Sequence, residues 1–375
     1  MSTPHVSSGT VVLTASGSGA GGPEGPGDGT YDFDPERLTG SVLPRYAIWV
    51  SAAIGVAVGL VVRFTGITLI GLADWVMAVL AFFIVFTTWT LLVEGRRHAV
   101  DRLATTAIYA AAVAALVPLF WILITVVVKG LSVMSWSFLT ETMRNVNPRA
   151  EGGGVAHAIV GTLEQVAIAA AIAVPIGILS AVYLVEYGRG HLARAISFFV
   201  DVMTGIPSIV AGMFIYTFWI LTLGFPTSGL AAGLALSILM IPVVVRATEE
   251  ILKIVPNELR EGALALGVPK YKVIIRIVLP TAISGIITGV MLAVARVTGE
   301  TAPLLLTTFL AQDMNWNPFS GNQASLPVFI WDQIQRGTSA SLDRAWGGAF
   351  VLILIVMIFY AGARILAAIY APKKV

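Results

Sequence analysis

The sequence predicts an all-α fold, a polytopic bundle of membrane-spanning helices. The chain has 375 residues, of which 57% are hydrophobic and 12% charged, and its mean hydropathy is +0.87. Soluble domains carry about 25% charged residues, so a water-soluble fold of this size would lack the polar groups to cover its surface. Apolar stretches of about 20 residues, long enough to cross a hydrocarbon core, recur along the chain and are separated by charged segments.

Eight of these stretches are predicted to span the membrane. The charge-free run 202–245 is too long for one crossing, and GFPTSG at 224–229 supplies a turn that divides it into two. The helix that contains 165–185 is expected to begin a few residues earlier, near His157. The predicted spans are 46–62, 75–93, 103–128, 165–185, 202–223, 230–245, 281–309 and 345–363.

Composition also excludes several kinds of function. The first 40 residues are rich in Gly, Ser and Pro and have no positive segment before an apolar core, so residues 1–40 are predicted to be a disordered cytoplasmic tail. The chain has no cysteine, which excludes disulfides and thiolate metal sites. A formal net charge of +2 gives no reason to expect a nucleic-acid partner.

The basic residues predict the orientation of the bundle. If every predicted span crosses, four basic segments fall on one side of the membrane, and by the positive-inside rule that side is the cytoplasm. Both termini then lie in the cytoplasm, and the loops 130–156 and 310–344 face outward. The basic segments are 94–102, 186–195, 246–276 and 372–375.

The segment 246–280 is too polar to cross the membrane and too apolar to be a slack linker. EEILKIV and NELREGALALG within it each favour a short helix, and Asn257 is placed to cap the second. Gly267 is a candidate stop for that helix. An amphipathic helix at this position can either lie along the membrane or fill a groove in a partner protein, and the residues alone leave both open.

This loop resembles the EAA loop of the permeases of ATP-binding-cassette (ABC) importers, whose pattern is E-A-A-x3-G-x9-I-x-L-P. EGALALGVPKYKVIIRIVLP keeps the spacing of that pattern, with Gly262 in place of the middle residue's usual Ala. The matching residues are Glu261, Ala263, Gly267, Ile277, Leu279 and Pro280.

The resemblance implies a role for the loop. In such permeases it forms a coupling helix that docks into a cleft of a separate ATPase subunit. It follows that a short set of residues would carry movement of the ATPase to the membrane helices. The residues implied for ATPase coupling are Glu258, Glu261, Gly262, Ala263, Leu264 and Gly267.

Four further motifs, taken in order, resemble the A-type subunit of phosphate-specific permeases. They are GGGVAHAIVGTLEQV, AVPIGILSAVYLVEYG, TGIPSIVAG and ARVTGETAPLLLTTF. The resemblance implies a bacterial plasma-membrane protein with the type I ABC importer permease fold. The six-helix permease domain would cover 103–375, with its coupling loop at 246–280, and 41–102 would be an N-terminal extension of two extra spans.

Charged residues inside the predicted spans are the candidates for a substrate pathway. Arg296 and Glu300 are four residues apart and are expected on one helical face of 281–309. Such residues usually face the bundle interior, because a charge at the bilayer centre costs about 2.5–3.5 kcal/mol on insertion scales. A guanidinium suits phosphate oxygens; equally, the two charges can neutralise each other and only lock the helix.

Two more charged residues complete the candidate pathway. Arg246 is expected to end its span at the cytoplasmic interface, where snorkelling competes with a role in phosphate passage. In the resembled permeases, basic residues at the Arg296 position and near the Arg246 position are implicated in that passage. Asp201 precedes TGIPSIVAG, in which Gly205 and Pro207 are expected to interrupt or kink the helix.

No G-x-x-x-x-G-K-[ST] pattern and no catalytic constellation occur, so the chain is expected to hold neither ATP nor another cofactor and to be no enzyme. The partners implied by the resemblance are a related C-type permease, a dimer of ATP-binding subunits, an extracytoplasmic phosphate-binding protein, phosphate and the membrane lipid. Three alternatives stay open at this point: an importer for sulfate, molybdate or another oxyanion, a gradient-driven transporter, and a membrane scaffold that signals phosphate status.

Overall fold

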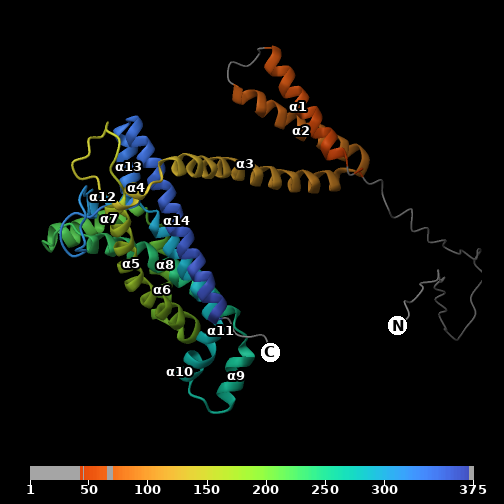
Figure 1. Ribbon diagram of the computed structural model, residues 1–375. Helices are drawn as coiled ribbons and strands as arrows, with labels where there is room; N and C mark the ends of the chain where they lie inside the picture. The colour runs from red at the N-terminus through yellow and green to blue at the C-terminus, as the bar shows by residue number, and fades with distance from the viewer. Residues whose placement is uncertain (1–42, 45, 66–70, 371–375) are drawn as a thin grey trace, which may run out of the picture. The chain divides into compact units, whose positions relative to one another are not determined.

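The computed structural model describes residues 43–370, apart from residue 45 and residues 66–70, and these described residues form helices and no strands (Figure 1). The predicted tail 1–40 lies outside the described residues. The chain divides into two compact units, Met1–Ala114 and Ala115–Val375. Helix α3, Arg96–Val133, continues through the boundary between them.

The first unit is built on a hairpin of two apolar helices, α1 (Ala47–Thr65) and α2 (Gly71–Glu94). Gly55 allows the two backbones to approach closely, because a Cβ there would lie 2.7 Å from the carbonyl oxygen of Ala78. Glu94 closes the end of the hairpin: its carboxylate accepts from the backbone N–H of Leu43 and pairs with Arg102 at 2.7 Å.

The second unit holds the remaining helices. After the end of α3 come α4 (Trp136–Thr140), α5 (Ala156–Val182), α6 (His191–Gly205), α7 (Ser208–Ile215), α8 (Gly229–Ile254), α9 (Asn257–Ala265), α10 (Lys270–Val273), α11 (Leu279–Thr298), α12 (Ala302–Thr307), α13 (Leu326–Arg336) and α14 (Ser339–Tyr370). Short π-helical segments extend α5 (Tyr183–Tyr187) and α7 (Tyr216–Thr222) and join α10 to α11 (Ile274–Val278).

Among the described residues, seven helices are long and apolar enough to cross a membrane, or eight when the bent pair α6 and α7 is counted as one span. The axis of that pair turns by 106° between Gly205 and Ser208. Pro207 causes the break, since it has no backbone N–H and forces Ile206 into an extended conformation. The predicted interruption at Gly205 and Pro207 is therefore confirmed.

The prediction of one continuous span over 281–309 is wrong. Helix α11 ends at Thr298, and α12 starts at Ala302 after a short non-helical segment. Gly299 is a poor helix former. In a continuous helix the ring of Pro303 would clash with the backbone carbonyl of Gly299, four residues earlier, so the helix is interrupted before Pro303. The apolar stretch thus holds two helices, and hydropathy alone did not reveal the break.

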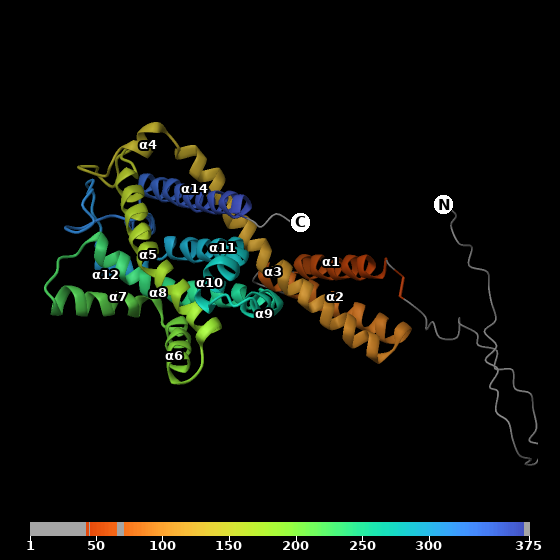
Figure 2. The same ribbon diagram turned by 90° about the horizontal axis from the view of Figure 1, so that it is seen from below.

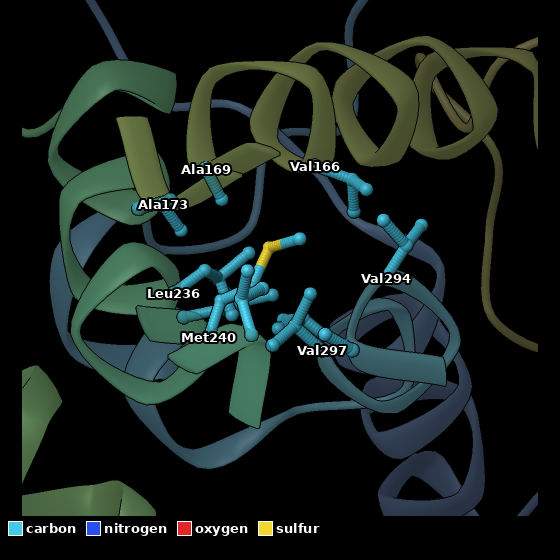
Figure 3. Close-up of a cluster of buried hydrophobic side chains, with 12 residues drawn as sticks. Val166, Ala169, Ala173, Leu236, Met240, Val294 and Val297 are labelled. Atoms are coloured by element: carbon cyan, nitrogen blue, oxygen red, sulfur yellow. The ribbon is translucent and has the colours of Figure 1, made fainter. Parts of the chain in front are cut away.

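The core of the second unit lies where α5, α8 and α11 meet (Figure 3). Small residues allow this packing: Ala169 and Ala173 on α5 face Leu236 and Met240 on α8, and Val297 closes the cluster from α11. Many large apolar side chains outside the core are exposed, as expected for helices that face lipid.

The arrangement of the helices gives the second unit two ends. Helices α9 and α10 lie at one end, and α4, α12 and α13 lie toward the other (Figure 1). Helix α11 packs against α8 on one side and α14 on the other (Figure 2). The candidate pathway and coupling residues lie on α6, α8, α9 and α11 and on the segments that follow α9 and α11.

Candidate functional site

The predicted coupling loop 246–280 is shorter than expected, because long helices enter it from both sides. The segment EEILKIV is not a separate short helix but part of the end of α8, which continues to Ile254. On the other side, Lys270–Thr298 is one long helical span that includes α10 and α11. The connection between them is α9 with short turns at 255–256 and 266–269.

Helix α9 has the position and the ends that the sequence predicts, with one correction. Pro256 occupies the N-cap position and Asn257 is the first helical residue, so Asn257 does not cap the helix. Its side-chain oxygen instead accepts from Arg260 Nη1 at 3.1 Å. Gly267 has a φ of +78°, the left-handed conformation that favours glycine, and it stops the helix as predicted.

The predicted coupling residues divide into one anchor and an exposed set. Ala263 is the only buried residue of α9 and packs into an apolar cluster with Val255 and Val273. Leu264 and the adjacent Leu266 expose their side chains, and Leu266 is 85% exposed. The other predicted coupling residues are also exposed: Glu258, Glu261, Gly262 and Gly267. The free surface of α9 is therefore apolar with acidic residues beside it.

Two of the predicted pathway residues form an ion pair between helices. Asp201 on α6 pairs with Arg246 on α8. Arg246 also pairs with Glu249 at 2.7 Å, and Glu249 pairs in turn with Lys253 at 2.7 Å. The arrangement is a chain of alternating charges that ties α6 to α8.

Arg246 does not end its helix, contrary to the prediction, because α8 continues for two more turns to Ile254. Its guanidinium is directed to carboxylates on two elements. A pocket of ≈ 410 Å³ opens beside this ion-pair chain, and Arg194, Ser197, Asp201 and Glu249 are among the residues that line it. The pocket opens on the Asp201 and Glu249 carboxylates of this chain of charges, and Arg246 is not among its lining residues.

The structure separates the other two pathway candidates. Arg296 lies in the last turn of α11, whereas Glu300 lies in the non-helical segment after it. They do not share a helical face, which corrects the prediction, and no ion pair joins them in the described parts of the chain. The helix break after Thr298 is the physical reason. A locking Arg296–Glu300 pair is absent from these described contacts, and Arg296 stays exposed.

Arg296 lies on a polar stripe of α11. The helical spacing places Thr281, Ser284, Thr288 and Leu292 on the same face, and three of these four carry hydroxyl groups. The opposite face, with Ala282, Ile286 and Ala293, is buried in the bundle. The nearest of these hydroxyls, on Thr288, lies about 12 Å along the helix from Arg296. The exposed guanidinium is therefore the group of this stripe that can offer an oxyanion charge-assisted hydrogen bonds.

Sequence reasoning did not single out three residues that the structure brings into these sites. Glu249 and Lys253 follow Arg246 at i+3 and i+7, a helical spacing that pattern analysis of the longer α8 would have found. Arg260 contacts Glu186, 74 residues away, and no local signal predicts that contact. Among the described residues, no group of three His, Asp or Glu side chains is placed to hold a metal ion.

Comparison with known protein families and proteins agrees with this architecture. The model of the family "Binding-protein-dependent transport system inner membrane component" matches residues 173–375. The match includes the segment from α8 to α11, so all of the candidate pathway and coupling residues lie inside it.

Three proteins named as phosphate transport system permeases are similar over most of their own length. PstA 1 of Mycobacterium tuberculosis (strain ATCC 25618 / H37Rv) is 46% identical over 292 residues, which cover 78% of this chain and 94% of that protein. PstA of Mycobacterium leprae (strain TN) is 48% identical over 279 residues, 73% of this chain and 92% of that protein. PstA of Yersinia pestis is 39% identical over 282 residues, 75% and 93% of the two chains. The chain therefore belongs to the PstA family of phosphate transport system permease proteins and is a multi-pass protein of the inner membrane.

Proposed function

We propose that this chain is the membrane permease subunit of an ATP-driven importer of inorganic phosphate. The observation that carries the proposal is the 46% identity to a phosphate transport system permease over 94% of that protein's length. Because identity at this level covers 94% of that protein, the substrate in its name is the simplest inference for this chain.

Energy enters through α9. Its exposed leucines and acidic residues suit a groove on an ATP-binding subunit. A dimer of such subunits binds and hydrolyses ATP, and this chain carries out no reaction of its own. Closure of that dimer displaces α9 and opens the pathway outward, and hydrolysis resets the inward-facing state. Phosphate shifts this equilibrium only through different affinities for the two states.

The pathway is formed by two permeases. This chain supplies half of it, with Arg296 as the oxyanion-binding group on the polar stripe of α11, and a related C-type permease supplies the other half. The Asp201–Arg246 pair lies further along, on α6 and α8, and a passing phosphate competes with the Asp201 carboxylate for the guanidinium. An extracytoplasmic phosphate-binding protein delivers the substrate at the opposite end from α9.

Orientation follows from the basic segments. The termini and α9 lie in the cytoplasm, and the loops around 130–156 and 310–344 lie outside. Residues 103–375 form the six-helix permease domain, and residues 41–102 form an N-terminal extension with two spans. Neither ATP nor any other cofactor is held by this chain.

The first test is uptake of radiolabelled phosphate at low micromolar concentration by cells that lack the gene. They are re-supplied with the native chain or with Arg296→Gln, and labelled sulfate is followed in parallel. We expect the native chain to restore phosphate uptake and not sulfate uptake. Arg296→Gln should lower uptake about tenfold to a hundredfold, the loss of one charge-assisted hydrogen bond of about 1.5–3 kcal/mol.

The matched control is Arg144→Gln, which removes an equal charge from a side chain that is 74% exposed and 3.6 Å from Asp313. It should leave uptake unchanged. Sulfate uptake that depends on the chain would instead make this a permease for another oxyanion. Phosphate uptake that survives without the chain, in cells with no second uptake system, would contradict the proposal.

A second experiment separates an ATP-driven importer from a gradient-driven transporter. The tagged chain is purified in mild detergent and tested for an accompanying ATP-binding subunit. We expect co-purification with the native chain and its loss with Glu261→Lys, which reverses an exposed charge on α9. Uptake that continues without any ATP-binding subunit and collapses with the ion gradient would favour the gradient-driven class.

A further inference from the structure

Helix α9 is attached to the bundle by surprisingly little apolar surface. Ala263 is its only buried residue, and the leucines of the helix point away from the bundle. A helix that transmits force needs a stiff attachment, and burial of one methyl group does not provide it. Polar contacts of one α9 side chain, Arg260, add to this attachment.

Arg260 makes four hydrogen bonds to three parts of the chain. Its Nε donates to Glu186 Oε1 at 2.9 Å, and Nη1 donates to the carbonyl oxygen of Val255 at 2.5 Å and to Asn257 Oδ1 at 3.1 Å. Its Nη2 donates to the carbonyl oxygen of Leu252 at 2.7 Å. The Leu252 and Val255 carbonyls belong to the C-terminal end of α8, where helix carbonyls lack partners and favour a cation.

The ion pair with Glu186 is shielded from water. The Arg260 side chain is 14% exposed and the Glu186 side chain 7%. A buried pair with further hydrogen bonds is stiff, and removal of one partner leaves the other charge buried and unpaired. Lys270, just beyond α9, holds the same segment: its ammonium donates to the carbonyl oxygen of Glu186 and lies 4.7 Å from the centre of the Tyr187 ring.

Glu186 lies in the last turn of a long helical span. Helix α5 and the π-helical segment after it form one span, Ala156–Tyr187. At the far end of that span, Thr162 Oγ1 accepts from the backbone N–H of Leu326 at 2.8 Å, and Gly161 lies against the carbonyl of Ala324. The same helix therefore contacts the coupling segment at one end and the loop before α13 at the other.

We propose that the Arg260–Glu186 ion pair is the contact through which displacement of α9 moves α5 and, with it, the loop 308–325 at the opposite end. Arg260 and Glu186 are positioning residues: neither touches phosphate or ATP. The inference rests on the proposed function. Loss of the pair is expected to uncouple ATP hydrolysis from transport rather than to abolish either the assembly or the hydrolysis.

The test uses the complete importer in proteoliposomes, with its binding protein, and measures two rates in the same vesicles. These are ATP hydrolysis and uptake of radiolabelled phosphate, and the readout is phosphate transported per ATP hydrolysed. For Glu186→Gln and Arg260→Lys we expect this ratio to fall about tenfold, within the range usual for coupling between two sites, while hydrolysis continues. Arg260→Lys keeps the charge and removes the fork that reaches Glu186 and the α8 carbonyls together.

The control is Arg336→Gln. Arg336 pairs with Asp332 at 2.7 Å, and both side chains are 21% exposed, but the pair lies within α13 and joins no two elements. It should leave the ratio unchanged. A purely structural role for Arg260 would lower the amount of assembled complex in the variants and leave the ratio of the remaining complexes at the native value. That outcome would overturn the inference.

A second readout does not depend on transport. The chain contains no cysteine, so Phe319→Cys introduces a single thiol at an exposed position of the loop 308–325. In the native background its labelling rate should change when a non-hydrolysable ATP analogue is added to the detergent-solubilised complex, and in Arg260→Lys it should not. An unaltered response in Arg260→Lys would refute the inference. If instead the native complex hydrolyses ATP but transports no phosphate, the proposed function is wrong and the labelling result still decides the coupling.

Discussion

The loop 308–325 and helix α9 lie at opposite ends of the second unit and are held in opposite ways (Figure 1). The loop is joined to α5 by a buried polar network. Gln323 Nε2 donates to Glu164 Oε2 at 2.5 Å, and Gln165 Nε2 donates to Gln323 Oε1 at 3.1 Å and to the carbonyl of Ala324 at 3.3 Å. Gln165 and Gln323 are both fully buried.

Helix α9 shows the reverse pattern. Its apolar residues are exposed and its buried contact with the bundle is a single Ala side chain and an ion pair. Large exposed apolar side chains on a short polar loop mark an interaction site, whereas buried amides that bond to each other fix a segment within its own chain. At the loop end the polar groups are therefore paired within this chain, whereas the exposed apolar residues of α9 form a surface that a partner can cover.

The largest expected effect is at Gly161, on the side of α5 that meets the loop. A Cβ there would lie 2.0 Å from the carbonyl oxygen of Ala324, so Gly161→Ala must displace the loop backbone. We expect a loss of about 3 kcal/mol in the free energy of unfolding, at the upper end of the usual cost of overpacking. The measurement is the thermal unfolding midpoint of the purified chain in detergent.

Gly362→Ala is the matched control, because it makes the same change inside a helix where a Cβ would meet nothing within 4 Å. Its unfolding midpoint should equal or slightly exceed that of the native chain, since Ala is the better helix former. Equal destabilisation by both variants would mean that the loop does not pack closely against Gly161. The loop would then not be fixed against α5 at this end of the unit.

A smaller effect is expected from Gln323→Leu. The change removes one of the two acceptors of the buried Gln165 amide, which keeps the carbonyl of Ala324, and removes a donor from the half-buried Glu164 carboxylate. The expected cost is about 1–3 kcal/mol of unfolding free energy, measured by the same thermal assay. Asn322→Ala, next in sequence, removes one exposed bond to Thr227 and should cost less than about 0.5 kcal/mol. A similar loss in both variants would show that burial of the network contributes nothing.

Much of the fold can be predicted from the sequence, because the length of an apolar stretch indicates the position of most spans, although it did not reveal the break within 281–309. The break at Pro207 follows from the chemistry of proline, and the stop at Gly267 from that of glycine. Helix ends are a different matter. Charged residues end a hydropathy peak without ending a helix. Hydropathy therefore places RATEEILK in a loop, although its spacing allows the Arg246–Glu249 and Glu249–Lys253 pairs along α8.

The candidate sites were only partly predictable for a related reason. The residues of α9 follow from a local motif with fixed spacing. The Asp201–Arg246 and Arg260–Glu186 pairs join positions 45 and 74 residues apart, and only the packing of α6 and α5 beside α8 and α9 brings them together. The expected Arg296–Glu300 pairing relied on an unbroken helix, and the break after Thr298 removed its basis.

The smallest expected effect is that of Gly262→Ala on α9, and it tests whether this end of the unit is free of contacts. Gly262 lies within α9, and a Cβ there would meet nothing within 4 Å, so Gly262→Ala should stabilise the helix by about 0.5–1 kcal/mol through backbone entropy alone. The substitution that disrupts α5 at Gly161 is thus expected to be favourable on α9, because none of the described residues covers that surface. The unfolding midpoint of the isolated permease should not fall, and its affinity for the ATP-binding subunit, measured by titration in detergent, should stay the same or rise as α9 becomes better ordered. A lower midpoint in the isolated chain would mean that this surface of α9 packs against its own bundle, and the surface would then not be free for a partner.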